Sequence, residues 1–149
     1  IPEPDSSFDA IMCIEVLEHL PDPVQAIKEF SRLIKSKGHL ILTAPFCSLT
    51  HFSPYHFSTG FNKYWYEIHF AANALKIIDI IPNGNFFEYV AQEIDRIPSI
   101  SKRYSKSKPG LLERLNIFII LQMLLRVSKK DSGSSDLLCF GYHVHAIKS

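Results

Sequence analysis

Short, continuously apolar runs alternate in the first half of the chain with segments whose apolar residues recur every three or four positions. Residues 9–14 (DAIMCI) and 39–44 (HLILTA) are two such runs, and each is typical of a strand buried on both faces of a parallel sheet. Between them, apolar residues recur at helical spacing, at Val24, Ile27, Phe30 and Ile34. Strand, helix and strand in this order predict a βαβ unit with parallel strands and a right-handed crossover.

The helix of this unit has clear signals at both ends. Asp22 is a candidate N-cap, Pro23 suits the first helical turn, and Gln25 lies at the capping-box spacing. Lys35 and Gly38 are typical of the residues that follow a helix.

The rest of the chain predicts further elements with a less regular pattern. A loop rich in aromatic residues and histidine (residues 46–60) precedes a helix that begins near Thr59 and carries an apolar stripe at Phe61, Trp65, Ile68, Ala72 and Leu75. We then expect a strand at 76–81, a helix at 85–97, a basic linker at 99–110, an apolar helix at 111–127, a polar linker at 128–136 and a last strand at 137–147.

Composition narrows the class of protein. With 149 residues, of which 46% are hydrophobic, the chain can form one sizeable core, and its net charge of +1 gives no overall attraction to nucleic acid. Its three cysteines are far apart and form no CxxC pair, which argues against a disulfide framework or a structural zinc site and favours a reducing compartment. We therefore expect a cytoplasmic protein.

Several motifs in a fixed order carry a family resemblance. They are residues 5–9 (DSSFD), 15–20 (EVLEHL), 21–23 (PDP), 37–40 (KGHL) and 43–45 (TAP), followed by 54–57 (PYHF) and 141–144 (GYHV). This order resembles the second half of a class I S-adenosylmethionine (SAM)-dependent methyltransferase of the small-molecule "type 11" kind. The resemblance is strong over 1–81 and 140–148 and weak over 82–139.

The resemblance implies an α/β fold, a Rossmann-like sheet whose strands follow the order 3-2-1-4-5-7-6 with the last strand antiparallel. On that template the chain supplies strands 4, 5, 6 and 7, with a helical insert at 83–136, so 1–149 is a partial methyltransferase domain. The glycine-rich turn that cradles SAM would lie upstream. We expect that the natural protein continues upstream, or that a partner covers the strand at 9–14, which otherwise is an exposed apolar edge.

Glu15, Glu18 and His19 lie just past the end of the first strand, on the side where open α/β sheets bind ligands. At helical spacing they share one face, and two carboxylates with an imidazole suit Mg²⁺, Mn²⁺ or Zn²⁺. Ubiquinone-pathway and small-RNA 2′-O-methyltransferases carry a similar ExxEH that binds a divalent metal, which implies these three ligands here, with His51 or His56 as a further one. Two other readings stay open: His19 or His56 acts as general base, or these residues only form structural hydrogen bonds.

The resemblance also implies a cofactor side. Ile14 matches a family position beside the SAM methionine or ribose, and we place Cys13, Ile14 and Glu15 on the SAM-binding side. Cys13 is expected to be a small buried strand residue and not a nucleophile, because methyl transfer needs no enzyme thiol. Aromatic residues that could line an acceptor pocket are Phe52, Tyr55, Phe57, Tyr64 and Trp65, with core packing the alternative for Trp65.

The segment 99–130 departs from the family pattern. Basic residues flank the apolar helix at 111–127, which resembles a segment that lies at a membrane surface or a lid over a lipophilic substrate. The alternative is a helix that packs on its own domain or in a dimer. No interleaving of aromatic and basic residues points to nucleic acid.

The sequence therefore predicts a SAM-dependent methyltransferase that acts on an oxygen, or less readily a nitrogen or carbon, of a small acceptor, for which a lipophilic molecule is one candidate. A second hypothesis is a non-catalytic methyltransferase-like module that works by binding a partner. A dehydrogenase is disfavoured, because EVLEHLPDP is not typical of that class.

Overall fold

The computed structural model describes residues 1–149, which fold into two compact units. The first comprises Ile1–Asn83 and Phe140–Ser149, and the second comprises Gly84–Cys139.

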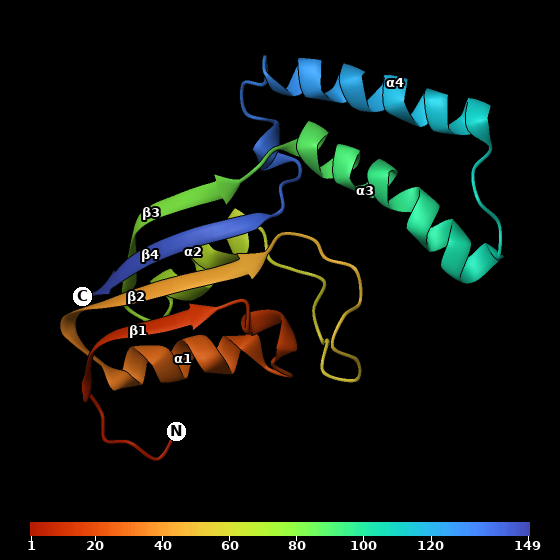
Figure 1. Cartoon of the computed structure of the whole chain (residues 1–149). Coiled ribbons are helices and arrows are strands. Elements are labelled where there is room, and N and C mark those ends of the chain that lie inside the picture. Colours follow the sequence, from red (N-terminus) through yellow and green to blue (C-terminus); the bar gives the residue numbers. More distant parts are fainter. The chain divides into compact units, whose positions relative to one another are not determined.

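The first unit is built on a four-stranded sheet (Figure 1). Its strands are β1 (Phe8–Ile14), β2 (Ile34–Pro45), β3 (Leu75–Asn83) and β4 (Gly141–Lys148), in the spatial order β1-β2-β4-β3. β1 pairs with β2 in parallel, whereas β4 lies antiparallel between β2 and β3. This confirms the predicted parallel βαβ unit and the predicted order of strands 4, 5, 7 and 6 with the last one antiparallel.

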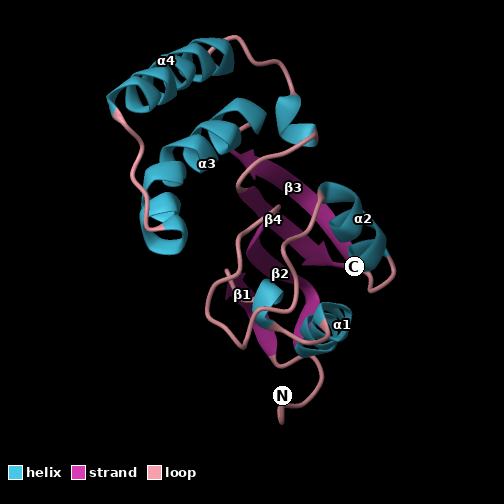
Figure 2. Ribbon diagram, turned by 90° about the vertical axis from the view of Figure 1, so that its right-hand side faces the viewer, coloured by secondary structure: helices cyan, strands magenta, loops and turns pink.

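Two helices, α1 (Pro23–Leu33) and α2 (Lys63–Ala71), cover the same face of this sheet (Figure 2). They bury apolar side chains against the alternate strand residues that point toward them. Among the residues with 0% exposure are Ile27 and Leu33 of α1, Tyr66 and Phe70 of α2, Leu40 and Leu42 of β2, and Ala146 of β4. The core of the unit therefore lies between this face and the two helices.

The predicted start of α1 is confirmed, and two boundaries were wrong. Asp22 is the N-cap, because its carboxylate accepts a hydrogen bond from the Gln25 backbone N–H at 2.8 Å. β2 begins at Ile34, well before the expected residue 39. α1 therefore ends at Leu33, and Ile34, which the apolar spacing placed in the helix, belongs to the strand. α2 is capped by Asn62 and not by Thr59, since the Asn62 side chain accepts from the Trp65 N–H at 3.0 Å.

Gly38 permits the close approach of β1 to β2. A Cβ at this position would lie 2.7 Å from Ile34 Cγ2 and 2.8 Å from the Asp9 backbone oxygen, which is closer than side chains tolerate. Gly38, which the sequence predicts as a residue that follows the helix, is therefore also required for the pairing of β1 with β2.

β1 forms an edge of the sheet and remains apolar on its uncovered side. Met12 is 68% exposed and Ile14 is 45% exposed, and Ile41 of the neighbouring β2 is 39% exposed. No helix of the first unit covers this face (Figure 2). The expectation of an exposed apolar edge at 9–14 is confirmed.

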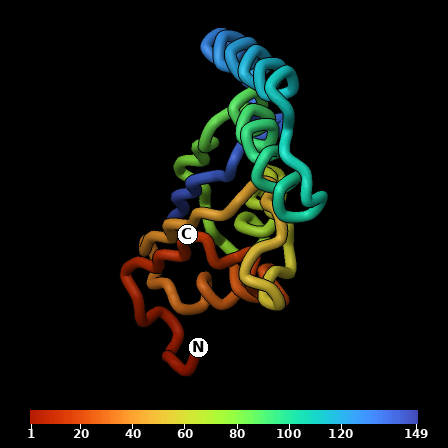
Figure 3. The backbone as a smooth tube through the Cα atoms, turned by 45° about the vertical axis from the view of Figure 1, so that its right-hand side comes forward, coloured from red at the N-terminus to blue at the C-terminus, as the bar shows by residue number.

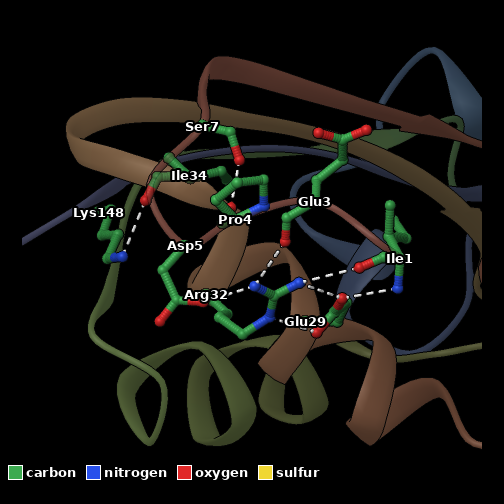
Figure 4. A network of polar contacts seen from close by, with 9 residues as sticks. All are labelled: Ile1, Glu3, Pro4, Asp5, Ser7, Glu29, Arg32, Ile34 and Lys148. Carbon is green, nitrogen blue, oxygen red and sulfur yellow. Dashed lines mark hydrogen bonds and ion pairs between the residues drawn. The ribbon is translucent and has the colours of Figure 1, made fainter.

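Arg32 of α1 holds the segment before β1 in place (Figure 4). Its guanidinium donates to Asp5 Oδ1 at 2.5 Å, to the Glu3 carbonyl oxygen at 2.9 Å and to Glu29 Oε1 at 2.7 Å. Because the Arg32 hydrogen bonds favour the ionised form, the pKa of Glu29 is lowered to about 2.

The second unit is a pair of helices, α3 (Phe86–Ile100) and α4 (Leu111–Ser128), with a π-helical turn at Ser101–Ser105 and a 3₁₀ turn at Ser134–Asp136. Asn85 caps α3 and donates to the Ser128 hydroxyl at 2.9 Å, which joins the start of one helix to the end of the other. α3 continues through Pro98, so part of the predicted linker at 99–110 is helical. The final strand begins at Gly141 rather than at residue 137.

None of the helices has the length and apolar character needed to cross a membrane.

Candidate functional site

The turn that follows β1 places a short acidic segment at the carboxyl end of the parallel strands. The Glu15 backbone N–H donates to the Thr43 carbonyl oxygen of β2 at 2.9 Å, and Glu15 has a left-handed φ of 51°. The chain then forms a 3₁₀ turn over Leu17–His19, in which Leu17 is 0% and Glu18 1% exposed. This turn directs the Glu18 side chain inward and the Glu15 side chain toward solvent.

The loop that follows β2 folds back onto this turn. It is the yellow segment of Figure 3, and it runs beside the turn after β1. The backbone N–H groups of Phe57 and Ser58 donate to the Glu18 carbonyl oxygen at 2.9 and 3.2 Å. Within the loop, the Ser48 N–H and hydroxyl both donate to the Thr59 carbonyl oxygen, at 2.6 and 3.0 Å. The two loops are therefore fixed to each other by backbone hydrogen bonds.

This arrangement brings one buried carboxylate together with two imidazoles. Glu18 Oε1 lies 3.6 Å from His19 Nε2 and 3.9 Å from His51 Nε2. Glu18 Oε2 is buried and has no hydrogen-bond partner. One ligand atom from each of Glu18, His19 and His51 can be chosen so that all lie within 4.8 Å of one another.

The other ring nitrogens of the two histidines contact backbone carbonyl groups. His19 Nδ1 contacts the Tyr55 carbonyl oxygen, and His51 Nδ1 lies 2.8 Å from the Leu49 carbonyl oxygen. A carbonyl oxygen can only accept a hydrogen bond, so each Nδ1 carries the proton. In a neutral ring the Nε2 lone pair is then free, and it lies on the side of the Glu18 carboxylate.

A third histidine and an aromatic ring border this pair. The ring centroid of His56 lies 4.7 Å from that of His51 and 6.0 Å from that of His19, and His56 Nε2 lies 3.2 Å from the Ser48 hydroxyl. The Phe52 ring packs edge to face against the rings of His19 and His51, and its centroid lies 5.6 Å from each of theirs. The His51 side chain is 37% exposed, so the cluster is open to solvent on one side.

The residues that the structure groups as possible metal ligands differ in one member from the predicted set of Glu15, Glu18 and His19. Glu18 and His19 lie together as expected, His51 occupies the third place, and Glu15 is not among the grouped residues. His51 was only a secondary candidate, because no sequence spacing connects it to Glu18. The sole sequence signal was the density of histidine and aromatic residues in the loop 46–60.

The residues on the expected cofactor side follow one another at the end of β1. Cys13 is 5% exposed, and its burial, together with the negative charges of Glu18 and Glu15, raises the pKa of its thiol to about 11. The thiol is therefore protonated at neutral pH and unsuited to act as a nucleophile. Ile14 and Glu15 are exposed, at the edge of the sheet where a further strand or a ligand can approach.

The aromatic residues proposed for an acceptor pocket divide into two groups. Phe52, Tyr55 and Phe57 belong to the loop beside the histidines and are 78%, 66% and 51% exposed. The other two lie on α2. Tyr64 is 57% exposed, and Lys63 Nζ lies 5.3 Å from its ring centroid. Trp65 packs against Phe61 and His69, with its ring centroid 4.6 Å from each of theirs. The packing alternative for Trp65 is thus the one that fits.

Comparison with known proteins locates a family match at this site. The family described as "Methyltransferase domain" matches residues 1–42, which include β1, the Glu18 turn and α1. A ubiquinone biosynthesis O-methyltransferase of Alkalilimnicola ehrlichii is 50% identical over 36 residues, which are 24% of this chain and 15% of that protein. One of Vibrio atlanticus is 30% identical over 78 residues, or 52% of this chain and 27% of that protein.

Solved structures extend the likeness of the fold to nearly the whole chain. The [4+2]-cyclase SpnF superposes with a TM-score of 0.52 and 20% identity, covering 99% of this chain and 52% of that one. Phosphoethanolamine N-methyltransferase 2 of Haemonchus contortus, in complex with S-adenosyl-L-methionine, gives a TM-score of 0.52 at 14% identity, covering 97% of this chain and 34% of that one. This chain thus spans about half or less of the length of these neighbours.

Proposed function

We propose that this chain, which carries part of a methyltransferase domain of the class I SAM-dependent fold, belongs to an enzyme that transfers the methyl group of SAM to an oxygen of a small acceptor. The observation that carries the proposal is the cluster at the carboxyl ends of β1 and β2: a buried carboxylate beside two imidazoles whose Nε2 lone pairs are free. A hydroxyl group needs such groups to lose its proton as it attacks the sulfonium methyl.

The donor side of the site involves the end of β1. In this proposal Cys13, Ile14 and Glu15 contact SAM. Because the Cys13 thiol is neutral, it contacts SAM only by van der Waals packing and takes no part in the chemistry. Because the neighbouring structures are about twice as long as this chain or longer, we propose that the rest of the SAM pocket comes from residues outside 1–149.

A divalent cation fits the residues that are present. Glu18 Oε2 is buried without a partner, and an uncompensated buried charge is costly by several kcal/mol, so a cation beside it would remove that cost. The carbonyl contacts of His19 and His51 are those that metal-binding histidines usually make with their second nitrogen. When bound, the cation would make the acceptor hydroxyl more acidic. Glu18, His19 and His51 would hold it, and two imidazoles with one carboxylate suit Mn²⁺ or Zn²⁺ better than Mg²⁺.

In this arrangement His56 remains available as a base. It stands beside His51 and contacts the Ser48 hydroxyl, which orients its ring. Without a cation, His19 is the alternative base, because the Tyr55 carbonyl fixes its proton on Nδ1 and leaves Nε2 to accept one. The exposed rings of Phe52, Tyr55 and Phe57 would contact the apolar part of the acceptor.

The test uses this chain together with the residues outside 1–149 that the proposal requires for the SAM pocket. SAM binding is measured by calorimetry, and methyl transfer to a panel of phenols and catechols is measured with EDTA or with added Mn²⁺ or Zn²⁺. Glu18→Gln and His51→Gln are expected to lower cation-dependent turnover at least about 100-fold, and His56→Gln is expected to lower turnover about 100-fold when the cation is present. His39→Gln, an exposed histidine of β2 outside the cluster, is the matched control and should change little.

Different failures have different meanings. A protein that does not bind SAM overturns the enzyme and leaves the non-catalytic binding module. Turnover that EDTA does not reduce overturns the cation and leaves His19 or His56 as base. Methylation only of amines or carbon nucleophiles overturns the oxygen acceptor.

A further inference from the structure

The helix α4 has more apolar surface than its partner α3 can cover. Ile117, Leu121 and Leu124 recur every three or four residues and are the more covered apolar side chains of its middle, with Leu124 only 7% exposed. They form the side that packs on α3 within the second unit. One stripe of this kind is enough to hold two helices together.

A second apolar stripe lies on the opposite side of α4. Leu112, Leu115, Ile119 and Met123 are 75%, 53%, 55% and 44% exposed, and their spacing places them on one helical face. We call these four residues the outer stripe. Contiguous exposed apolar surface of this kind marks a site that binds a protein or a membrane.

Positive charge surrounds the outer stripe. The segment 102–130 has a net charge of +7 in a chain whose net charge is +1. Arg126 and Lys130 continue the line of the outer stripe at helical spacing, and four further cations lie in the segment before the helix, at Lys102, Arg103, Lys106 and Lys108. The single acidic residue, Glu113, accepts a hydrogen bond from the Gly110 N–H at 2.6 Å and caps the helix.

Two shallow hollows on this surface meet at Arg126. The first is largely apolar and is lined by Phe118, Ile119 and Met123 together with Gln122 and Arg126. The second also includes Arg126 and is lined by Lys130, Ser132 and Ser134, by the apolar Phe87 and Val127, and by Asp131. The Asp131 carboxylate accepts from the Ser134 N–H at 3.2 and 3.3 Å, so it is engaged within its own turn. A largely apolar hollow that shares Arg126 with one lined by two cations, two hydroxyl groups and a single carboxylate that is bonded within its own turn matches a lipid, whose acyl chain adjoins an anionic headgroup.

Charge argues against a second copy of the chain as the occupant. Packing two outer stripes together would bring Arg126 and Lys130 of both copies into one interface, and no acidic residue lies on the stripe to compensate them. An anionic surface instead attracts each of these cations while the apolar residues insert.

We propose that the outer stripe and its flanking cations bind the surface of an anionic lipid bilayer, with α4 lying along the membrane plane. The 18 residues of α4 would then present about 27 Å of helix to the headgroup region. This proposal does not depend on methyl transfer, because it rests on the second unit alone.

The experiment is co-sedimentation of the full chain with vesicles. One set contains only phosphatidylcholine, and the other contains about a third phosphatidylglycerol. We expect binding to the anionic vesicles that weakens as salt increases, and little binding to the neutral ones. Arg126→Glu/Lys130→Glu should lower the partition coefficient about 30-fold or more, since each cation near such a surface contributes about fivefold. Lys28→Glu/Lys76→Glu, two exposed lysines of the first unit, makes the same charge change and should not lower it by more than about threefold.

A second pair of variants keeps the test decisive if the charge reversals disturb folding. Ile119→Ser/Met123→Ser removes apolar surface that is already exposed, so circular dichroism should be unchanged while vesicle binding falls. The proposal is overturned if anionic vesicles do not bind the chain, or if neither pair of variants weakens binding. It is also overturned if light scattering shows a dimer that these variants dissociate, or if an RNA oligonucleotide competes away the vesicles through the same cations.

Discussion

Glutamine at position 18 separates a cation site from a structural carboxylate. Glu18→Gln keeps the shape of the side chain and removes its negative charge. The carboxylate is 1% exposed, its Oε2 has no partner, and its Oε1 lies 3.6 and 3.9 Å from the Nε2 atoms of His19 and His51. Those distances are too long for strong hydrogen bonds, so the charge is poorly compensated by the protein itself.

The Glu18→Gln substitution is expected to change the free energy of unfolding in opposite directions without a cation and with one. In the presence of a chelator, removing an uncompensated buried group should leave the variant equal to the wild type or more stable by about 1–3 kcal/mol. With a cation at about 100 times its dissociation constant, the wild type gains about 2.7 kcal/mol and the variant gains almost nothing, because one of its three ligands is lost. The order of stability should therefore reverse.

Thermal unfolding followed by circular dichroism measures this reversal. For a domain of this size, 1 kcal/mol corresponds to about 4 °C in the unfolding midpoint. The wild type should therefore unfold about 10 °C higher with saturating Mn²⁺ or Zn²⁺ than in EDTA, and Glu18→Gln should unfold at nearly the same temperature in both. His39→Gln, which alters a histidine outside the cluster, should respond to the cation as the wild type does.

Two results would contradict this reasoning. If Glu18→Gln is destabilised by several kcal/mol in EDTA, the carboxylate is held by interactions within the protein and is not a vacant ligand. If the variant and the wild type gain the same stability from the cation, the cation binds elsewhere.

Three further outcomes follow from the first unit. The pKa of about 11 for Cys13 makes its thiolate fraction at pH 8 about 100-fold smaller than that of a thiol with the usual pKa of 9.0. Iodoacetamide should therefore alkylate Cys13 at least about 100-fold more slowly than a small free thiol of the usual pKa. A comparable rate would show that the Cys13 thiol is not buried. Gly141→Ala should destabilise the fold by about 1–3 kcal/mol in urea unfolding, because the new Cβ would lie 2.5 Å from the Ala44 carbonyl oxygen, and an unchanged midpoint would contradict this contact. Glu29→Gln should lower the unfolding midpoint above pH 4.5, and its difference from the wild type should disappear as the pH falls through about 2, where the carboxylate that Arg32 holds ionised becomes protonated; a difference independent of pH would contradict the ion pair.

Local sequence determined the elements of the first unit and several of their ends. The period of apolar residues distinguishes a strand from a helix, and a capping side chain acts within three residues, so both can be recognised without the fold. Asp22 caps α1 as predicted, and the order of strands follows from the family motifs. Where two signals compete locally the prediction failed: Thr59 resembles a cap as much as Asn62 does, and in the structure it is Asn62 that accepts the Trp65 N–H.

The sequence alone also placed Glu18 and His19 at the end of a strand, because they are neighbours in the turn that follows it. Only the tertiary structure decided that His51 joins them and Glu15 does not. That choice depends on Glu15 adopting a left-handed backbone next to Thr43, and on Phe57 and Ser58 hydrogen bonding to the Glu18 carbonyl. These contacts join residues that are 28 to 40 positions apart in the sequence, so the local pattern of residues does not predict them. The pattern of residues therefore determines which side chains reach this edge of the sheet, and the closure of the loops determines which of them meet.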